Sequence, residues 1–176
     1  MNILKTRKLV IGAMFSAIYV VAAAILTVDL PGIKFSLSSV PIILSALLLG
    51  VPDCLAVSFC GAFIDQMLYG LGPTTILWLI PPVIQSLFVG LFKNKIENNN
   101  IRMVLVIVTA EFLLTFVNTA AVIVDSKIIG YSIAALAVLL PTRIINGCAR
   151  AVCSASVAVI LLPTLKKILG RSGEEK

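Results

Sequence analysis

The sequence predicts an all-α fold: a polytopic integral membrane protein, built as a six-transmembrane-helix bundle with cytoplasmic termini. Hydrophobic residues make up 60% of the 176-residue chain and charged residues only 12%, whereas a soluble domain carries about 25% charged residues. The apolar residues form runs close to the length of about 20 residues that crosses a bilayer. The basic residues stand at the ends of these runs, where membrane topology places them.

Breaks between the apolar runs divide the chain into the elements of a single transmembrane domain, residues 1–176. Pro31-Gly32 marks an outer loop over residues 29–36, because this pair favours turns. The apolar stretch 128–140, which ends at Pro141, is either a short interfacial helix or the kinked first part of the last helix. We expect the six helices at approximately residues 8–27, 37–49, 53–69, 74–92, 101–124 and 142–165.

The distribution of lysine and arginine sets the expected orientation. With six crossings, one side of the membrane receives ten of the fourteen basic residues, and the other side receives only Lys34 and Lys127. Since basic loops remain in the cytoplasm, both termini are expected there, in the plasma membrane of a bacterial cell. The ten are Lys5, Arg7, Lys8, Lys93, Lys95, Arg102, Lys166, Lys167, Arg171 and Lys176.

Several function classes are disfavoured by what the sequence lacks. The chain has no histidine, and its four cysteines lie within apolar segments at spacings unlike those of zinc sites. It has no GxxxxGK[ST] loop, so it is not expected to hydrolyse ATP itself. No basic patch with interleaved aromatic residues suggests nucleic acid. We therefore expect no metal, no cofactor, no nucleic-acid partner and no enzymatic activity.

Polar side chains within the expected helices predict an interior site. An ionisable group at the centre of a transmembrane helix costs on the order of 2.5–3.5 kcal/mol to insert, so such groups face the bundle interior. Their positions along the helices converge on the outer half of the bundle, except for Glu111, which is expected deeper. The residues are Asp65, Gln66, Gln85, Glu111, Asn118, Arg143, Asn146 and Arg150.

Charge suggests what such a pocket would bind. Arg143 and Arg150 face only one nearby acid, Asp65, so an anionic ligand would neutralise the remaining positive charge. Trp78, Tyr69 and Phe35 could stack on a flat ring. Two simpler interpretations stay open: buried ion pairs such as Asp65 with Arg150, and an interfacial aromatic belt for Tyr69 and Trp78.

Several motifs together resemble one family, the substrate-binding S components of energy-coupling factor (ECF) vitamin transporters, in particular the folate-specific type. The first helix carries Ala13-x-x-x-Ala17, and the third carries Gly61 and Asp65 before a glycine-rich turn. Val51-Pro52-Asp53 departs from the family's glycine-proline turn. The other similar segments are Ile33-Lys34-Phe35, Val40-Pro41, Gly50, Val117-Asn118-Thr119 and Leu140-Pro141-Thr142-Arg143-Ile144-Ile145.

The resemblance implies high-affinity binding of folate from outside, followed by docking on a transmembrane coupling subunit and two cytosolic ATPases. Ala13 and Ala17 would contact the coupling subunit. In this interpretation Asp65, Gln66 or Asn118 bonds the pterin edge; Trp78, Tyr69 or Phe35 stacks on the ring; and Arg143, Lys34 or Arg150 takes the carboxylates. The loop 29–36 would act as a lid.

Other functions remain open at this level. The same architecture could bind pantothenate, riboflavin, or a thiamine or pyrimidine precursor. A self-sufficient secondary transporter, with Glu111 on a proton path, is a second class, although the chain shows no internal repeat. A membrane protein of purely structural role, without any ligand, is a third.

Overall fold

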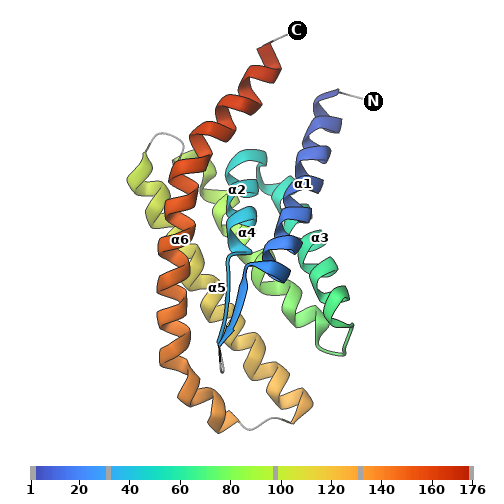
Figure 1. Ribbon diagram of the computed structural model, residues 1–176, viewed down its shortest axis with the longest axis vertical. Coiled ribbons are helices and arrows are strands. Elements are labelled where there is room, and N and C mark those ends of the chain that lie inside the picture. Colours follow the sequence, from blue (N-terminus) through green and yellow to red (C-terminus); the bar gives the residue numbers. More distant parts are fainter. Residues whose placement is uncertain (1–2, 31–32, 97–98, 131–132, 175–176) are drawn as a thin grey trace.

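The computed structural model describes residues 3–30, 33–96, 99–130 and 133–174. Six helices and one β-hairpin follow one another in these segments: α1 (Ile3–Ile25), β1 (Thr27–Leu30), β2 (Ile33–Ser36), α2 (Ser39–Leu49), α3 (Val51–Tyr69), α4 (Thr75–Ile96), α5 (Asn100–Ile129) and α6 (Ile133–Glu174). The start of α1 and the end of α6 lie at the same end of the bundle, and the hairpin points toward the other end (Figure 1). We call these the terminal end and the hairpin end.

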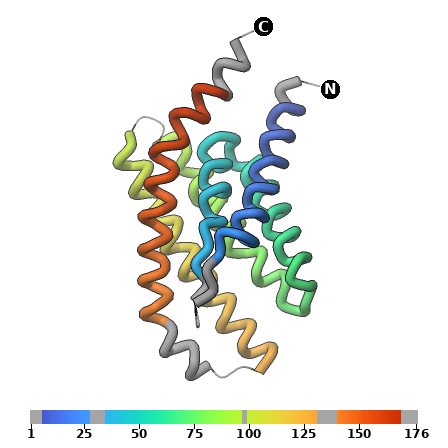
Figure 2. The backbone as a smooth tube through the Cα atoms, in the orientation of Figure 1, coloured from blue at the N-terminus to red at the C-terminus, as the bar shows by residue number. Residues whose placement is uncertain are grey.

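The helices form an incomplete ring around α2. Along the ring α1 packs on α3, α3 on α4, α4 on α5, and α5 on α6. Helix α2 contacts α1, α3, α4 and α6 and lies between α1 and α6 in the tube view (Figure 2). At the hairpin end, β2 packs against α6.

Helix α2 is short but deeply buried. Its 11 residues rise only about 16 Å, roughly half of the hydrocarbon thickness of a bilayer. Ile43 and Ala46 are fully buried, since neighbouring helices surround them. The other five helices each contain a segment long and apolar enough to cross a membrane. The structure therefore supports an all-helical membrane bundle with five long spans, and six complete crossings stay a prediction.

Backbone features explain where several helices begin and end. Gly50 has φ of 104°, a conformation that favours glycine, and it separates α2 from α3 with Pro52 in the first turn of α3. The Asn99 side chain accepts hydrogen bonds from the amides of Ile101 and Arg102 at the start of α5, as a helix N-cap does. Gly130 ends α5 in the left-handed conformation.

Three expectations about the elements were wrong. Strands β1 and β2 pair antiparallel, with Thr27 opposite Ser36 and Val28 opposite Phe35, so the segment expected as an outer loop contains two short strands, although the fold is 90% helical. Helix α5 continues through Asp125, Ser126 and Lys127 to Ile129, because the Ser126 hydroxyl bonds back to the carbonyl of Ile123 instead of opening the helix.

The third concerns Pro141, which lies inside α6 and does not end a segment. The stretch from Ile133 thus belongs to α6, which was one of the two interpretations. Proline removes a single donor from the helix ladder, and transmembrane helices tolerate that loss. Pro31 and Gly32, the expected hinge of the lid, lie outside the described residues.

Large apolar side chains cover the outside of the bundle. Leu9, Met14, Phe116 and Val152 are each more than half exposed, which would favour aggregation in water but suits contact with lipid. The interior at the terminal end is a continuous apolar core that includes Leu47, Val89, Ile107, Ala158 and Leu162.

Candidate functional site

A cavity of about 300 Å³ lies among α1, α2, α3, α4, α5 and α6, beside the end of β2. Eleven of its twenty lining residues are polar, although the surrounding bundle is apolar. The polar lining residues are Ser36, Ser38, Ser39, Asp65, Gln66, Gln85, Thr115, Asn118, Arg143, Asn146 and Arg150, and the larger apolar and aromatic ones include Tyr19, Ile42, Trp78, Pro81, Pro82, Leu114 and Val122.

The structure brings most of the predicted site residues together. Asp65 and Gln66 come from α3, Trp78 from α4 and Asn118 from α5, while Arg143 and Arg150 come from α6; all of them line the cavity. Convergence from four helices is what the matching depths along the helices predicted. Whether these residues bind a ligand stays a prediction.

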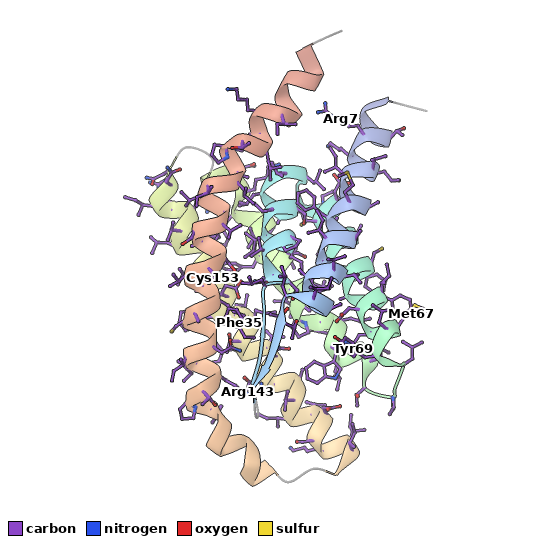
Figure 3. All side chains as sticks on the ribbon, in the orientation of Figure 1. Arg7, Phe35, Met67, Tyr69, Arg143 and Cys153 are labelled. Carbon is purple, nitrogen blue, oxygen red and sulfur yellow. The ribbon has the colours of Figure 1, made fainter. Side chains whose placement is uncertain are left out.

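The remaining predicted residues are not placed in the cavity. Tyr69 ends α3, is 60% exposed and is absent from the lining, which agrees with the alternative of an interfacial aromatic residue. Phe35 is partly buried on β2 and is also absent from the lining. The side chain of Lys34 lies outside the described residues. Figure 3 shows Arg143 and Tyr69 toward the hairpin end and Arg7 at the terminal end.

Arg150 is held in a buried ion pair at the inner side of the cavity. Its Nε lies 3.6 Å from Oε2 of Glu111, and its guanidinium donates to the Thr115 hydroxyl at 3.0 Å. The Ser154 hydroxyl donates to Oε1 of Glu111 at 2.8 Å and lies 3.3 Å from the Ser39 hydroxyl. These contacts tie α2, α5 and α6 together.

The expectation that Arg150 lacks a nearby acid other than Asp65 was therefore wrong. Glu111 and Arg150 meet because α5 and α6 approach closely at Gly147: a Cβ on Gly147 would lie 2.8 Å from the Thr115 hydroxyl. Position along the helix alone suggested that Glu111 lies too deep to reach the site. The long arginine side chain spans that difference in depth, which no count of residues reveals.

Pairing with Glu111 changes the charge balance of the site. The two arginines carry two positive charges, and Asp65 and Glu111 carry two negative charges, so the formal sum is zero. Among the side chains that the structure describes, the predicted excess of positive charge is therefore absent. Arg143 makes no ion pair within 4.0 Å among the described residues, and its buried Nε has no hydrogen-bond partner there.

Two functional candidates escaped the predicted set. Gln85 was recognised as a polar residue within a span but was not assigned to the site; it is completely buried and lines the cavity. The sequence did not mark Tyr19 as a site residue, because a tyrosine in an apolar helix is common. It lines the cavity where Gly61 permits close approach: a Cβ on Gly61 would lie 2.8 Å from the Tyr19 ring.

A cavity with polar side chains inside an apolar helical bundle is typical of one class: membrane proteins that bind a small organic solute within the bilayer. No cluster of three or more histidine, cysteine, aspartate or glutamate residues suited to a metal ion occurs among the described residues. The lining presents hydrogen-bonding groups, the Trp78 ring and the guanidinium of Arg143, while Arg150 is paired with Glu111.

The family is given by a comparison with protein-family models. Residues 3–167 match the family described as the ECF-type riboflavin transporter, S component, and the chain belongs to this family. No curated protein matches the sequence. The chain is therefore a multi-pass membrane protein and a vitamin-binding subunit of an ECF transporter, a transport protein and not an enzyme. Its family implies partnership with an ECF module.

Proposed function

We propose that the cavity binds riboflavin, taken up from outside the cell. The observation that carries the proposal is the charge balance of the site, since the Glu111–Arg150 pair leaves the described side chains of the cavity with a formal charge of zero. Riboflavin is uncharged, with a flat three-ring system and a chain of hydroxyl groups. The family description also points to this vitamin.

The lining matches both parts of such a molecule. Trp78, Pro81 and Pro82 present flat apolar surface from α4, against which a planar ring can stack. Asn118, Ser38 and Ser39 present amide and hydroxyl groups that can exchange hydrogen bonds with hydroxyls. The volume of about 300 Å³ lies at the lower end of ligand pockets, about 300–1,000 Å³, and therefore fits one small vitamin.

Folate is the second candidate, and one observation favours it. The Arg143 guanidinium lacks an ion pair among the described residues, and guanidinium groups bind carboxylates in bidentate fashion. However, folate brings two carboxylates, and among the described residues of the cavity Arg143 is the one cation outside an ion pair. Within that described part of the site the second carboxylate finds no countercharge, which is unfavourable for a buried group, unless it stays in water at the mouth of the cavity.

Docking and orientation complete the proposal. Ala13 and Ala17 are exposed on α1, amid exposed Leu9, Met14 and Ile18, and small residues at this spacing let another helix approach closely. This surface contacts the transmembrane coupling subunit, on which two cytosolic ATPases act. The terminal end faces the cytoplasm of a bacterium, and the cavity at the hairpin end opens outward.

Fluorescence of the purified protein tests the ligand. Trp78 is the single tryptophan of the chain and lines the cavity, so a stacked flavin should quench its emission and lose its own fluorescence. We expect saturable quenching by riboflavin with one ligand per chain, together with a higher thermal unfolding midpoint.

Trp78→Phe provides the control, because it removes the tryptophan signal while retaining an aromatic ring. Saturable binding of folate with no response to riboflavin would support the second candidate. A response to pantothenate or a thiamine precursor alone would contradict both.

The docking surface is tested by Ala13→Trp. A bulky side chain there should abolish riboflavin uptake by cells that contain the coupling module, while the purified variant keeps its affinity for riboflavin. Uptake at the normal rate would remove the role assigned to α1.

A further inference from the structure

Gln85 is a buried amide whose hydrogen-bonding groups are unused. It is completely buried and lines the cavity, yet neither Nε2 nor Oε1 has a hydrogen-bond partner among the described residues. It lies ten residues after Thr75, where α4 begins, and this corresponds to about 15 Å along the helix, near the middle of a bilayer. Burial of an amide without partners is unfavourable, so a bound molecule should supply them.

Other polar side chains of α4 and of the cavity have partners within the protein. The Ser86 hydroxyl, next in the chain, lies 2.8 Å from the Ser58 hydroxyl and bonds to the carbonyl of Val83. In the cavity lining, Arg150 is held by Glu111 and Thr115. Gln85 lines the same cavity, and both polar atoms of its amide lack a protein partner among the described residues.

The position of Gln85 on α4 relates it to the stacking surface. Trp78 and Pro82 precede it by seven and three residues, so all three lie on one face of the helix, and all three line the cavity. A flat ring that lies along this face therefore has its deep edge at Gln85.

The chemistry of an amide defines what that edge should carry. A glutamine side chain places a donor and an acceptor side by side, and the complementary group is a cyclic N–H next to a C=O, as in an imide or a lactam. The N–H donates to Oε1, and the C=O accepts from Nε2. Because the amide can flip by 180°, the same residue matches the carbonyl on either side of the N–H.

We propose that Gln85 recognises the imide edge of the flavin ring through two hydrogen bonds and thereby determines specificity for the heterocycle. This rests on the proposed function, since it assumes that a flavin occupies the cavity. It adds the orientation of the ring: the imide edge lies deepest, beside Gln85, and the hydroxylated chain extends toward the hairpin end.

A comparison of two ligands on two proteins tests the proposal. Riboflavin and 3-methylriboflavin differ by one methyl group on the imide nitrogen. The full-length protein, in detergent, should bind 3-methylriboflavin roughly 10- to 100-fold more weakly than riboflavin, as expected for the loss of one or two hydrogen bonds in a buried site. Gln85→Leu should bind riboflavin weakly and no longer distinguish the two ligands.

Asn94→Leu is the matched control, since it removes an amide from an exposed position of the same helix outside the cavity lining. It should retain normal affinity and discrimination. Gln85→Met, of similar length, replaces the leucine variant if the latter does not fold, as judged by its thermal unfolding midpoint.

Two outcomes overturn the proposal in distinguishable ways. If Gln85→Leu or Gln85→Met still discriminates between the two ligands as the original protein does, Gln85 does not contact the imide edge, although riboflavin binding stands. If the original protein binds neither flavin, the proposed function fails together with the role of Gln85.

Discussion

The two ends of the bundle treat buried polar groups differently. At the terminal end the core is apolar, and its few polar side chains have partners: the Ser58 and Ser86 hydroxyls lie 2.8 Å apart, and Lys93 donates to the carbonyl of Leu48. At the hairpin end the cavity contains Gln85 and the Nε of Arg143, which have no hydrogen-bond partners among the described residues.

This difference distinguishes buried polar groups that stabilise the fold from those proposed to bind a ligand. Buried groups that serve the fold are hydrogen-bonded, because an unpaired one lowers the free energy of unfolding. In the proposed function, the unsatisfied groups of the cavity receive their partners from the ligand, and the packed terminal end stabilises the bundle that contains them. The Glu111–Arg150 pair lies at the boundary between the two regions. The ion pair and the hydrogen bonds with Thr115 and Ser154 stabilise it, although Glu111 Oε2 and Arg150 Nε have no hydrogen-bond partner among the described residues.

The largest expected effect comes from breaking that pair. Arg150→Met leaves the Glu111 carboxylate buried without its countercharge, which should lower the free energy of unfolding by about 3–5 kcal/mol. The double variant with Glu111→Gln should recover much of the loss. Thermal unfolding in detergent measures the stability of the single and the double variant. If both are destabilised equally, the Glu111–Arg150 pair does not stabilise the fold.

A substitution that leaves an empty space in the apolar core should give the next largest loss of stability. Ile107 is fully buried at the terminal end, and Ile107→Ala should lower the free energy of unfolding by about 2–5 kcal/mol. The affinity of folded protein for riboflavin should be unchanged, because Ile107 does not line the site. Ligand titration below the unfolding midpoint would reveal any loss of affinity, which would argue against separate roles for the two ends.

Gly61→Ala should affect both properties moderately. The added Cβ would lie 2.8 Å from the Tyr19 ring, so the ring must shift, at a cost of about 1–3 kcal/mol typical of overpacking. Since Tyr19 lines the cavity, ligand affinity should fall as well. Gly72→Ala, at a position with open space, is the control and should change neither quantity.

Arg143→Gln should have the smallest effect on stability, about 0.5 kcal/mol or less, as for substitutions that break no network. Its effect on affinity distinguishes the ligands. Riboflavin should bind less than about tenfold more weakly, whereas folate, if it binds, should lose roughly 10- to 100-fold with its charge-assisted bond. Titration of both vitamins against this variant measures the difference, and a large loss for riboflavin would contradict the neutral-ligand assignment.

Much of the architecture followed from the sequence because transmembrane helices have a strong local signal. Apolar runs with glycine and proline breaks gave the order of the helices and approximate ends, and seven of the eight intramembrane polar residues line the cavity, among them Asp65, Asn118 and Arg143. The hairpin was missed because two four-residue strands carry too short a pattern to distinguish them from a loop.

The sequence by itself determined that lipid surrounds this protein and how deep in the bilayer its polar groups lie. Both follow from the number of residues along single helices. Only the tertiary structure decided which groups meet. The partner of Arg150 and the isolation of Gln85 depend on how closely neighbouring helices approach and which side chains fill the space between them, and these contacts join residues that are distant in the chain.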